Sequence, residues 1–187
     1  MFLLSIILNH IISPLRKDKD FFMTQKNDTI VITKVPKKNR ILMAILFTKI
    51  LIILAPIRWY ILKHLPNCQN IDFVPGFRFL YGNIYARNCH LCDTFFVDYA
   101  PIYIGENTKF SFDNIIITSS HEKNDFTRVY AKPVYIGRNV WITSRCVILG
   151  GVKIGNNSII AAGSVVSKDI PSNCIAAGNP AKVVKHV

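Results

Sequence analysis

The feature that most constrains the fold of this chain is a period of six residues in its second half. Aliphatic residues recur at every sixth position: Ile136, Ile142, Ile148, Ile154, Ile160 and Val166. A six-residue step is too short for a helical repeat, and three such steps complete one triangular coil of parallel β-structure. Because each coil buries its aliphatic residues only by stacking on the next, the period predicts a solenoid.

A second series of small or β-branched residues lies two positions before the first: Val134, Val140, Cys146, Val152, Ser158 and Ser164. Gly137 and Gly155 directly follow members of the first series, and Asn139 and Asn157 come two residues later. Turns that need a positive φ accept Gly and Asn most easily, so we expect turns there. The same phase appears earlier, at Ile104, Phe110 and Ile116.

The period breaks between residues 117 and 133, where the sequence is polar and charged and ends at Pro133. This composition predicts a loop that projects from the coil. Loops carried by a rigid scaffold often hold the chemistry, so this insertion is the first place to look for an active site.

The stretch from about Tyr99 to Val184 resembles the hexapeptide-repeat acyltransferases, in particular the galactoside and maltose O-acetyltransferases and the bacterial polysaccharide O-acetyltransferases. The resemblance rests on APIYIGEN (100–107), SSH (119–121), KPVYIGRNVWI (132–142), GGVKIGNNSIIAAGSVVSKDIP (150–171) and AAGNPAKVV (176–184). It implies an all-β, left-handed parallel β-helix and a homotrimer with active sites between subunits. It also implies acetyl-CoA as the acyl donor and a saccharide hydroxyl as the acceptor.

His121 lies in the inserted segment, at the position of the family's general base. Acyl transfer to a hydroxyl needs a group that takes the hydroxyl proton, and imidazole changes charge near neutral pH, which suits that task. The resemblance further assigns the backbone amide of Ser144 to the oxyanion that develops on the acyl carbonyl. Without the surrounding motif, His121 would be read as a solvated loop residue.

The resemblance also assigns a donor site. Positions that match the pantetheine groove are Trp141, Ser144, Ala162 and Gly163, and Lys168 and Lys182 match basic positions that meet the nucleotide phosphates. Fixed positive charge is what a phosphate site requires, although either lysine could equally be an exposed surface charge.

The acceptor side departs from the family. Many relatives carry an Asn five residues before an Asp, whereas this chain has Asp93 before Asp98. We expect Asp93 and Asp98 to orient the acceptor hydroxyls, with the alternative that either is a turn residue in an irregular coil. The departure puts the identity of the acceptor sugar in doubt.

Residues 1–66 are expected to form an apolar and basic helical segment that could associate with a membrane, and we assign residues 67–187 to the β-helix acyltransferase domain. The first segment holds 11 Lys and Arg against 3 Asp and Glu, out of a formal net charge of +12 for the whole chain. Its apolar run at 41–57 predicts a helix with basic flanks, too short and too charged at Lys49 for a simple membrane span. Two interpretations stay open: an in-plane helix at an anionic membrane surface, or a helix packed under the end of the main domain.

Several other functions are disfavoured by the sequence. The basic residues form no nucleic-acid reading motif, so no nucleic-acid partner is expected. Cys89-His90-Leu91-Cys92 has no second ligand pair at a suitable spacing, so no metal is expected. Five cysteines without a clear secretory signal predict free thiols in a reducing, cytoplasmic compartment, with the chain peripheral at the inner face of the cell membrane.

The leading hypothesis is therefore an acetyl-CoA-dependent O-acetyltransferase that acts on a cell-surface polysaccharide, a lipopolysaccharide or a lipid-linked sugar precursor. One alternative is a non-catalytic β-helix scaffold. The other is a zinc-dependent hydratase resembling the γ-type carbonic anhydrases, which would need three histidine ligands from a region that offers His90, His121 and His186.

Overall fold

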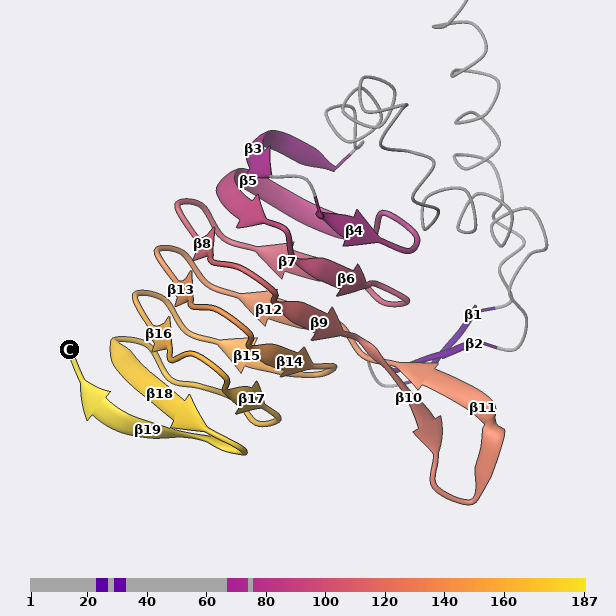
Figure 1. Cartoon of the computed structure of the whole chain (residues 1–187). Helices are drawn as coiled ribbons and strands as arrows, with labels where there is room; N and C mark the ends of the chain where they lie inside the picture. The colour runs from indigo at the N-terminus through magenta and orange to yellow at the C-terminus, as the bar shows by residue number, and fades with distance from the viewer. Residues whose placement is uncertain (1–22, 27–28, 33–66, 74–75) are drawn as a thin grey trace, which may run out of the picture.

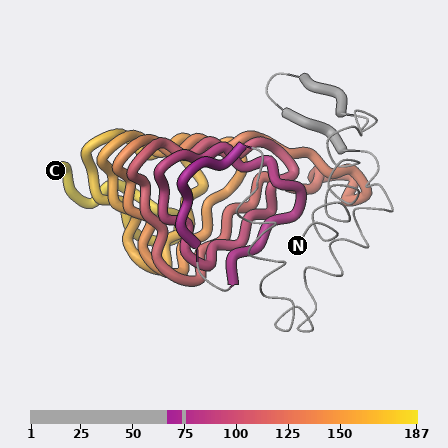
Figure 2. The backbone as a smooth tube through the Cα atoms, turned by 90° about the horizontal axis from the view of Figure 1, so that it is seen from above, coloured from indigo at the N-terminus to yellow at the C-terminus, as the bar shows by residue number. Residues whose placement is uncertain are grey.

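Short β-strands wind about one axis into a stack of coils, and a complete coil has three faces (Figure 1, Figure 2). The computed structural model describes residues 23–26, 29–32, 67–73 and 76–187. Strands of successive coils pair in parallel, and Ile136 pairs with Ile154, eighteen residues on. The predicted all-β fold, a left-handed parallel β-helix with an insertion, is confirmed.

Faces 1 and 2 belong to one sheet, because the long strand β5 contributes to both. The strands at its upper end are β3 (Cys68–Phe73) and β5 (Ile84–Cys92). Face 1 continues through β7 (Ile102–Ile104), β12 (Val134–Ile136) and β15 (Lys153–Ile154). Face 2 contains β8 (Lys109–Phe110), β13 (Trp141–Ile142), β16 (Ile159–Ile160), β18 (Cys174–Gly178) and the antiparallel β19 (Ala181–His186).

Face 3 is a separate parallel sheet. Its strands are β4 (Arg78–Phe79), β6 (Phe95–Val97), β9 (Ile115–Ile117), β14 (Val147–Leu149) and β17 (Val165–Val166). The chain turns from face 1 to face 2 at the first corner, from face 2 to face 3 at the second corner, and from face 3 to the next coil at the third corner.

Both six-residue series point into the coil, where every member is at most 4% exposed. A fully buried isoleucine contributes about 1.5–3 kcal/mol to folding, so stacked coils stabilise one another. The two serines in the interior are hydrogen-bonded: Ser158 Oγ donates to the Pro171 carbonyl at 2.8 Å, and Ser164 Oγ to the Ala161 carbonyl. Buried polar groups of this kind are tolerated because they are paired.

The turns contain one correction. Asn139 and Asn157 have φ values of 55° and 56°, as predicted, but Gly137 and Gly155 do not have a positive φ. Close approach of the next coil explains these glycines instead, since a Cβ on Gly137 would lie 2.8 Å from the backbone nitrogen of Asn156.

The insertion at the third corner is a β-hairpin formed by β10 (Ser119–Glu122) and β11 (Asp125–Ala131), here called the arm. It projects from the coil as predicted (Figure 1). Its polar sequence predicted a loop without strands, whereas β10 and β11 pair with each other in the structure.

A second hairpin extends the arm into a four-stranded antiparallel sheet. Strands β1 (Met23–Lys26) and β2 (Thr29–Ile32) come from the segment predicted to be helical, and β2 pairs with β11. The helical prediction is therefore wrong for residues 23–32. The predicted helix at 41–57 lies outside the described residues, and the domain boundary at residue 66 stays a prediction.

Candidate active site

Thr118 fixes the base of the arm to the coil. Its side chain is 2% exposed, and its Oγ1 donates to the Val97 carbonyl at 2.9 Å while it accepts from the Ala100 amide at 3.0 Å. On the returning strand, the Lys132 amide donates to the Thr118 carbonyl at 2.9 Å. The arm thus leaves and re-enters the coil at one hydrogen-bonded point.

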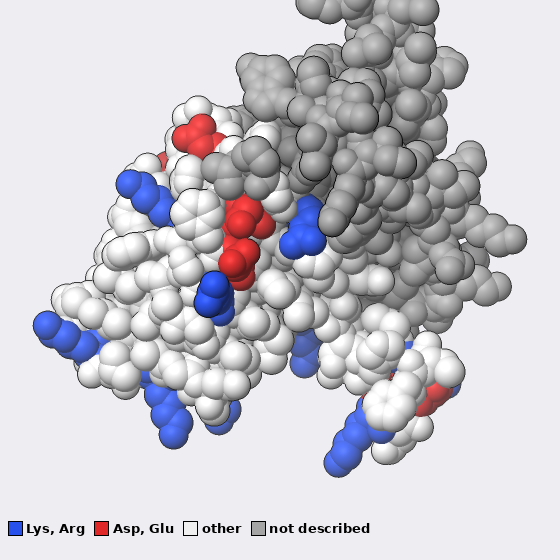
Figure 3. Space-filling model, in the orientation of Figure 1, with Lys and Arg blue, Asp and Glu red and all other residues white. Residues whose placement is uncertain are grey.

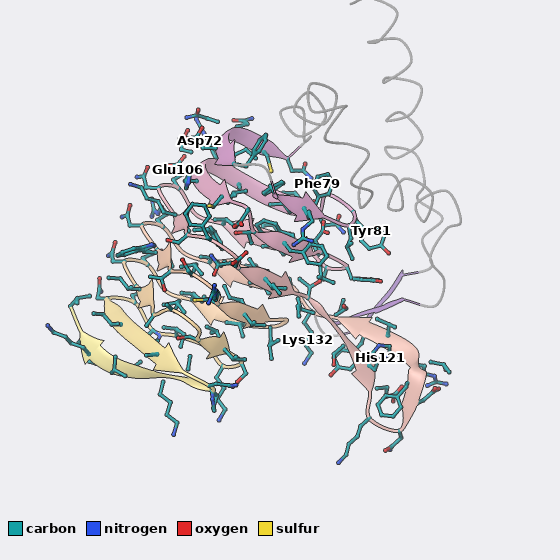
Figure 4. The ribbon with its side chains drawn as sticks, viewed as in Figure 1. Asp72, Phe79, Tyr81, Glu106, His121 and Lys132 are labelled. Atoms are coloured by element: carbon teal, nitrogen blue, oxygen red, sulfur yellow. The ribbon has the colours of Figure 1, made fainter. Side chains whose placement is uncertain are left out.

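His121 lies on β10 of the arm, away from the body of the coil (Figure 4). Its side chain is exposed, and Nδ1 lies 2.7 Å from the Phe126 carbonyl oxygen. A carbonyl oxygen only accepts hydrogen bonds, so Nδ1 is the donor and carries the ring proton. This tautomer leaves Nε2 with a lone pair that is available to take a proton, as a general base requires.

The register of the arm changes next to this histidine. The pairing shifts between His121 and Glu122, which is a β-bulge or similar irregularity. Bulges are common beside active sites because they re-aim a side chain.

Phe126 was missed by the sequence analysis. It provides the carbonyl that orients His121, and its ring packs edge to face against the imidazole at 6.4 Å between centroids. At 75% exposed, it has the most exposed large apolar side chain of the described residues. A phenylalanine within the charged insertion was the available signal.

Ser144 lies at the second corner, between β13 and β14. Its carbonyl accepts from the Gly163 amide at 3.0 Å, which joins it to the next coil. Its own amide donates to no other group among the described residues, so this N–H is free to point at a ligand. Backbone donors fixed in this way need little reorganisation to stabilise an oxyanion.

The other predicted donor-site residues surround the same corner. Trp141 is 49% exposed, and its Nε1 donates to Ser111 Oγ at 3.1 Å. Ala162 and Gly163 are exposed one coil below Ser144. Gly163 has a φ of 72°, and nothing lies within 4 Å of a Cβ built on it, so the backbone there is open to close approach.

The two predicted phosphate-binding lysines lie at different corners. Lys168 follows β17 at the third corner, next to Ser167, which helps line a cleft of about 210 Å³ at the base of the arm. Lys182 is on β19, paired with Ala177. Both lysines are exposed to solvent and lie in the C-terminal part of the coil. Figure 3 shows several basic side chains that project from this end of the molecule.

The two predicted acceptor residues have different surroundings. Asp93 lies at the second corner and is partly exposed, and its Oδ1 accepts from the Asp113 amide at 2.8 Å. Asp98 is 0% exposed, and its carboxylate accepts from the Leu80, Tyr81 and Asn83 amides at 2.7, 3.0 and 2.6 Å.

Asp98 is thus a structural turn residue, and the acceptor contact predicted for it is not available. Burial raises the pKa of the Asp98 carboxyl, and the amide N–H groups of Tyr81 and Leu80 oppose that shift. A carboxylate whose oxygens are already occupied by three backbone donors has no route to a ligand.

The candidate site residues fall into two groups, one at each end of face 3. His121 and Lys168 belong to the third corner, after β9 and β17, while Ser144 and Gly163 belong to the second corner, before β14 and β17. The strands of face 3 separate the two groups within one chain. A general base at one end and an oxyanion donor at the other do not act on the same atom within a single copy.

The cysteines show no metal-site geometry. Cys89 and Cys92 are buried thiols, and the single S–H of Cys89 has two carbonyl acceptors within reach, Arg87 at 3.1 Å and Gly105 at 3.2 Å. Among residues 67–73 and 76–187 and the short strands at 23–32, no three His, Cys, Asp or Glu side chains are grouped as a metal site requires. A search of the same residues for a helix able to cross a membrane found none.

The repeats match a known sequence family. The model for the bacterial transferase hexapeptide (six repeats) matches residues 133–168. The galactoside O-acetyltransferase of Escherichia coli is 37% identical over 114 residues, which cover 55% of this chain and 56% of that protein. This chain therefore spans little more than half of the length of that curated relative.

Solved structures of similar proteins include complexes with coenzyme A and with acetyl coenzyme A. A galactoside acetyltransferase bound to coenzyme A has a TM-score of 0.66 at 27% identity, covering 83% of this chain and 86% of that one. A hexapeptide-repeat acetyltransferase of Vibrio cholerae, in complex with acetyl coenzyme A, has a TM-score of 0.62 at 27% identity, covering 79% and 83%. The resemblance predicted from the sequence is confirmed.

Proposed function

Because the chain resembles the hexapeptide-repeat acetyltransferases in repeat, sequence and fold, we propose that it transfers an acetyl group from acetyl-CoA to a saccharide hydroxyl. The observation that carries the proposal is the geometry of His121, whose Nδ1 is held at 2.7 Å by the Phe126 carbonyl so that Nε2 is the free base. The His121 side chain is exposed on the arm, so a second molecule can reach it.

In this reaction, Nε2 of His121 takes the proton of the acceptor hydroxyl as the hydroxyl oxygen attacks the thioester carbonyl carbon. The Ser144 amide donates to the carbonyl oxygen while it carries negative charge. When the C–S bond breaks, the protonated imidazole returns the proton to the leaving thiolate. Atoms and charge balance, and His121 ends in its starting state.

The split of the site between the two ends of face 3 supports a homotrimer. In a closed ring, one end of face 3 meets the opposite end on the next copy, so the arm of one subunit would reach the Ser144 corner of its neighbour. Each active site then needs two subunits.

The outward side of face 3 fits such an assembly. Its residues are partly exposed and all apolar from β6 onward: Phe95, Val97, Ile115, Ile117, Val147, Leu149 and Val165. In a sheet with one face in solvent, polar residues on that face alternate with apolar residues on the buried face. The outward residues of face 3 are apolar, so this surface is suited to a protein contact.

The acceptor class and the location are part of the same proposal. A cell-surface polysaccharide, a lipopolysaccharide or a lipid-linked sugar precursor at the inner face of the cell membrane is supported by the basic and apolar composition of residues 1–66. Basic residues beside apolar ones are attracted to anionic lipid surfaces.

The decisive experiment measures CoA release with acetyl-CoA and a panel of saccharides, comparing the wild type with His121→Ala. We expect His121→Ala to lower kcat by roughly 10²–10⁴-fold while calorimetry shows unchanged acetyl-CoA binding. The matched control is His186→Ala, which removes an exposed histidine from β19. Equal turnover by His121→Ala and the wild type would refute the mechanism.

The assembly is tested separately by light scattering. Leu149→Glu places a charge on face 3 and should yield monomers without turnover, whereas Val184→Glu, at a 63% exposed aliphatic position on β19, should leave the trimer intact. A trimer that survives Leu149→Glu would show that face 3 is not the contact surface.

A further inference from the structure

Face 1 carries a column of stacked tyrosines that the transfer reaction does not use. Tyr85, Tyr103 and Tyr135 are paired in register on β5, β7 and β12, and each is 38–41% exposed. Their ring centroids are 4.9 and 5.1 Å apart, with interplanar angles of 27° and 11°. Lys153 continues the column, with Nζ 5.8 Å from the centre of the Tyr135 ring.

A groove of about 740 Å³ runs beside this column along the first corner. One wall is formed by the tyrosines, and the floor is the backbone of Gly105, Gly137 and Gly155. Glycine is required at these positions, because a Cβ on Gly105 would lie 2.6 Å from the carbonyl carbon of Gly137 in the next coil. The groove is therefore a permanent consequence of how the coils stack.

The chemistry of the groove disfavours an ionic ligand. Its lining has one basic and one acidic residue, Lys153 and Asp169, whose charges offset each other. A phosphate or polyanion site would need a surplus of positive charge.

The neutral polar side chains of the lining are Ser172 and the three tyrosines. Among the described residues, the hydroxyls of Tyr85, Tyr103 and Tyr135 have no hydrogen-bond partner. Tyrosine combines an apolar ring edge with a hydroxyl that both donates and accepts, which suits a neutral and hydroxyl-rich ligand.

The spacing of the column indicates a ligand with its own repeat. From one coil to the next, the tyrosine ring centroids advance by 4.9–5.1 Å, which is close to the length of one sugar unit in an extended glycan. A solenoid presents identical groups at a fixed interval and so matches a linear polymer unit by unit.

We propose that the tyrosine column and glycine floor of face 1 form a binding groove for an extended, uncharged glycan. The groove lies on faces and corners other than those that hold His121 and Ser144, so it is separate from the transfer site. Binding at this groove does not depend on acetyl-CoA or on turnover.

The test is calorimetric titration of the full chain with cellohexaose and hexa-N-acetylchitohexaose, and with a heparin hexasaccharide as the charged probe. We expect at least one neutral probe to bind, and Tyr103→Ala to weaken it by about tenfold. Tyr103→Phe keeps the ring and should weaken it less. Phe112→Ala removes a 58% exposed aromatic side chain from the second corner and should have no effect.

Acetyl-CoA binding by Tyr103→Ala serves as the folding control and should match the wild type, and a cooperative thermal transition above the titration temperature shows that the variant is folded, although the loss of two ring contacts lowers its midpoint. The proposal fails if neither neutral probe binds, if Tyr103→Ala binds them as the wild type does, or if the heparin hexasaccharide binds more tightly. It also fails if light scattering shows assembly beyond a trimer that Tyr103→Ala abolishes, since a second copy would then be the occupant. Absence of acetyl transfer would leave this result unaffected.

Discussion

Replacing Thr118 by valine removes one hydroxyl from the point at which the arm leaves the coil and leaves the shape of the side chain almost unchanged. The lost group is the acceptor for the Ala100 amide at 3.0 Å and a donor to the Val97 carbonyl at 2.9 Å. Val97 keeps a second hydrogen bond, from the Thr118 amide at 3.1 Å. Ala100 is 0% exposed, so its amide loses its partner without gaining water.

An unpaired buried donor costs about 1–3 kcal/mol, and we expect Thr118→Val to lower the free energy of unfolding by that amount. Because the same hydroxyl fixes the origin of β10, kcat should also fall while acetyl-CoA affinity is retained. Urea unfolding at a fixed protomer concentration measures the first effect, and CoA release measures the second.

Thr118→Ser is the matched control, because it keeps the hydroxyl and loses only a methyl group. It should retain more of both stability and turnover than Thr118→Val. If Thr118→Val unfolds at the same urea concentration as the wild type, the anchoring role of the hydroxyl is refuted.

Three further predictions address other parts of the molecule. The double variant Lys168→Ala, Lys182→Ala should weaken CoA binding, measured by calorimetry, by roughly tenfold or more, because charge-assisted contacts to phosphate are lost. Equal weakening by Lys185→Ala in the same assay would contradict a specific role for Lys168 and Lys182. Gly137→Ala should destabilise the coil by about 1–3 kcal/mol, since its Cβ meets the backbone of the next coil, and an unchanged thermal unfolding midpoint would contradict this. Burial raises the pKa of the Cys68 thiol from 9.0 to about 11, so its contribution to folding stability should be fully present well below pH 9.0 and be lost as the pH rises through 9.0 to about 11. Cys68→Ser should flatten that alkaline slope in urea titrations, and an unchanged slope would argue against the thiol.

The coil could be predicted because one rule repeats along it. Buried positions such as Ile142 and Ile160 have the same environment in successive coils, so an aliphatic residue recurs in the sequence every six residues. The upper coils depart from this period because larger side chains such as Phe77 and Phe96 fill the interior there.

Other features depend on contacts that no local pattern records. The pairing of β2 with β11 joins residues about a hundred positions apart, so neither strand's sequence identifies the partner. The tautomer of His121 depends on the Phe126 carbonyl, and the position of a backbone carbonyl cannot be inferred from the type of residue that carries it. Asp98 could not be told from a ligand-binding aspartate until its three amide donors were located.

The arm begins and ends at one hydrogen-bonded point, between the Thr118 carbonyl and the Lys132 amide. A segment attached in this way can be lengthened, shortened or exchanged without changing the register of the coil, since Tyr103 still meets Tyr135 across the insertion. Selection can therefore alter the part that carries His121 independently of the part that carries Ser144 and Gly163. For protein engineering, the same junction is a place where arms from other coils can be grafted and their acceptor preferences compared on one scaffold.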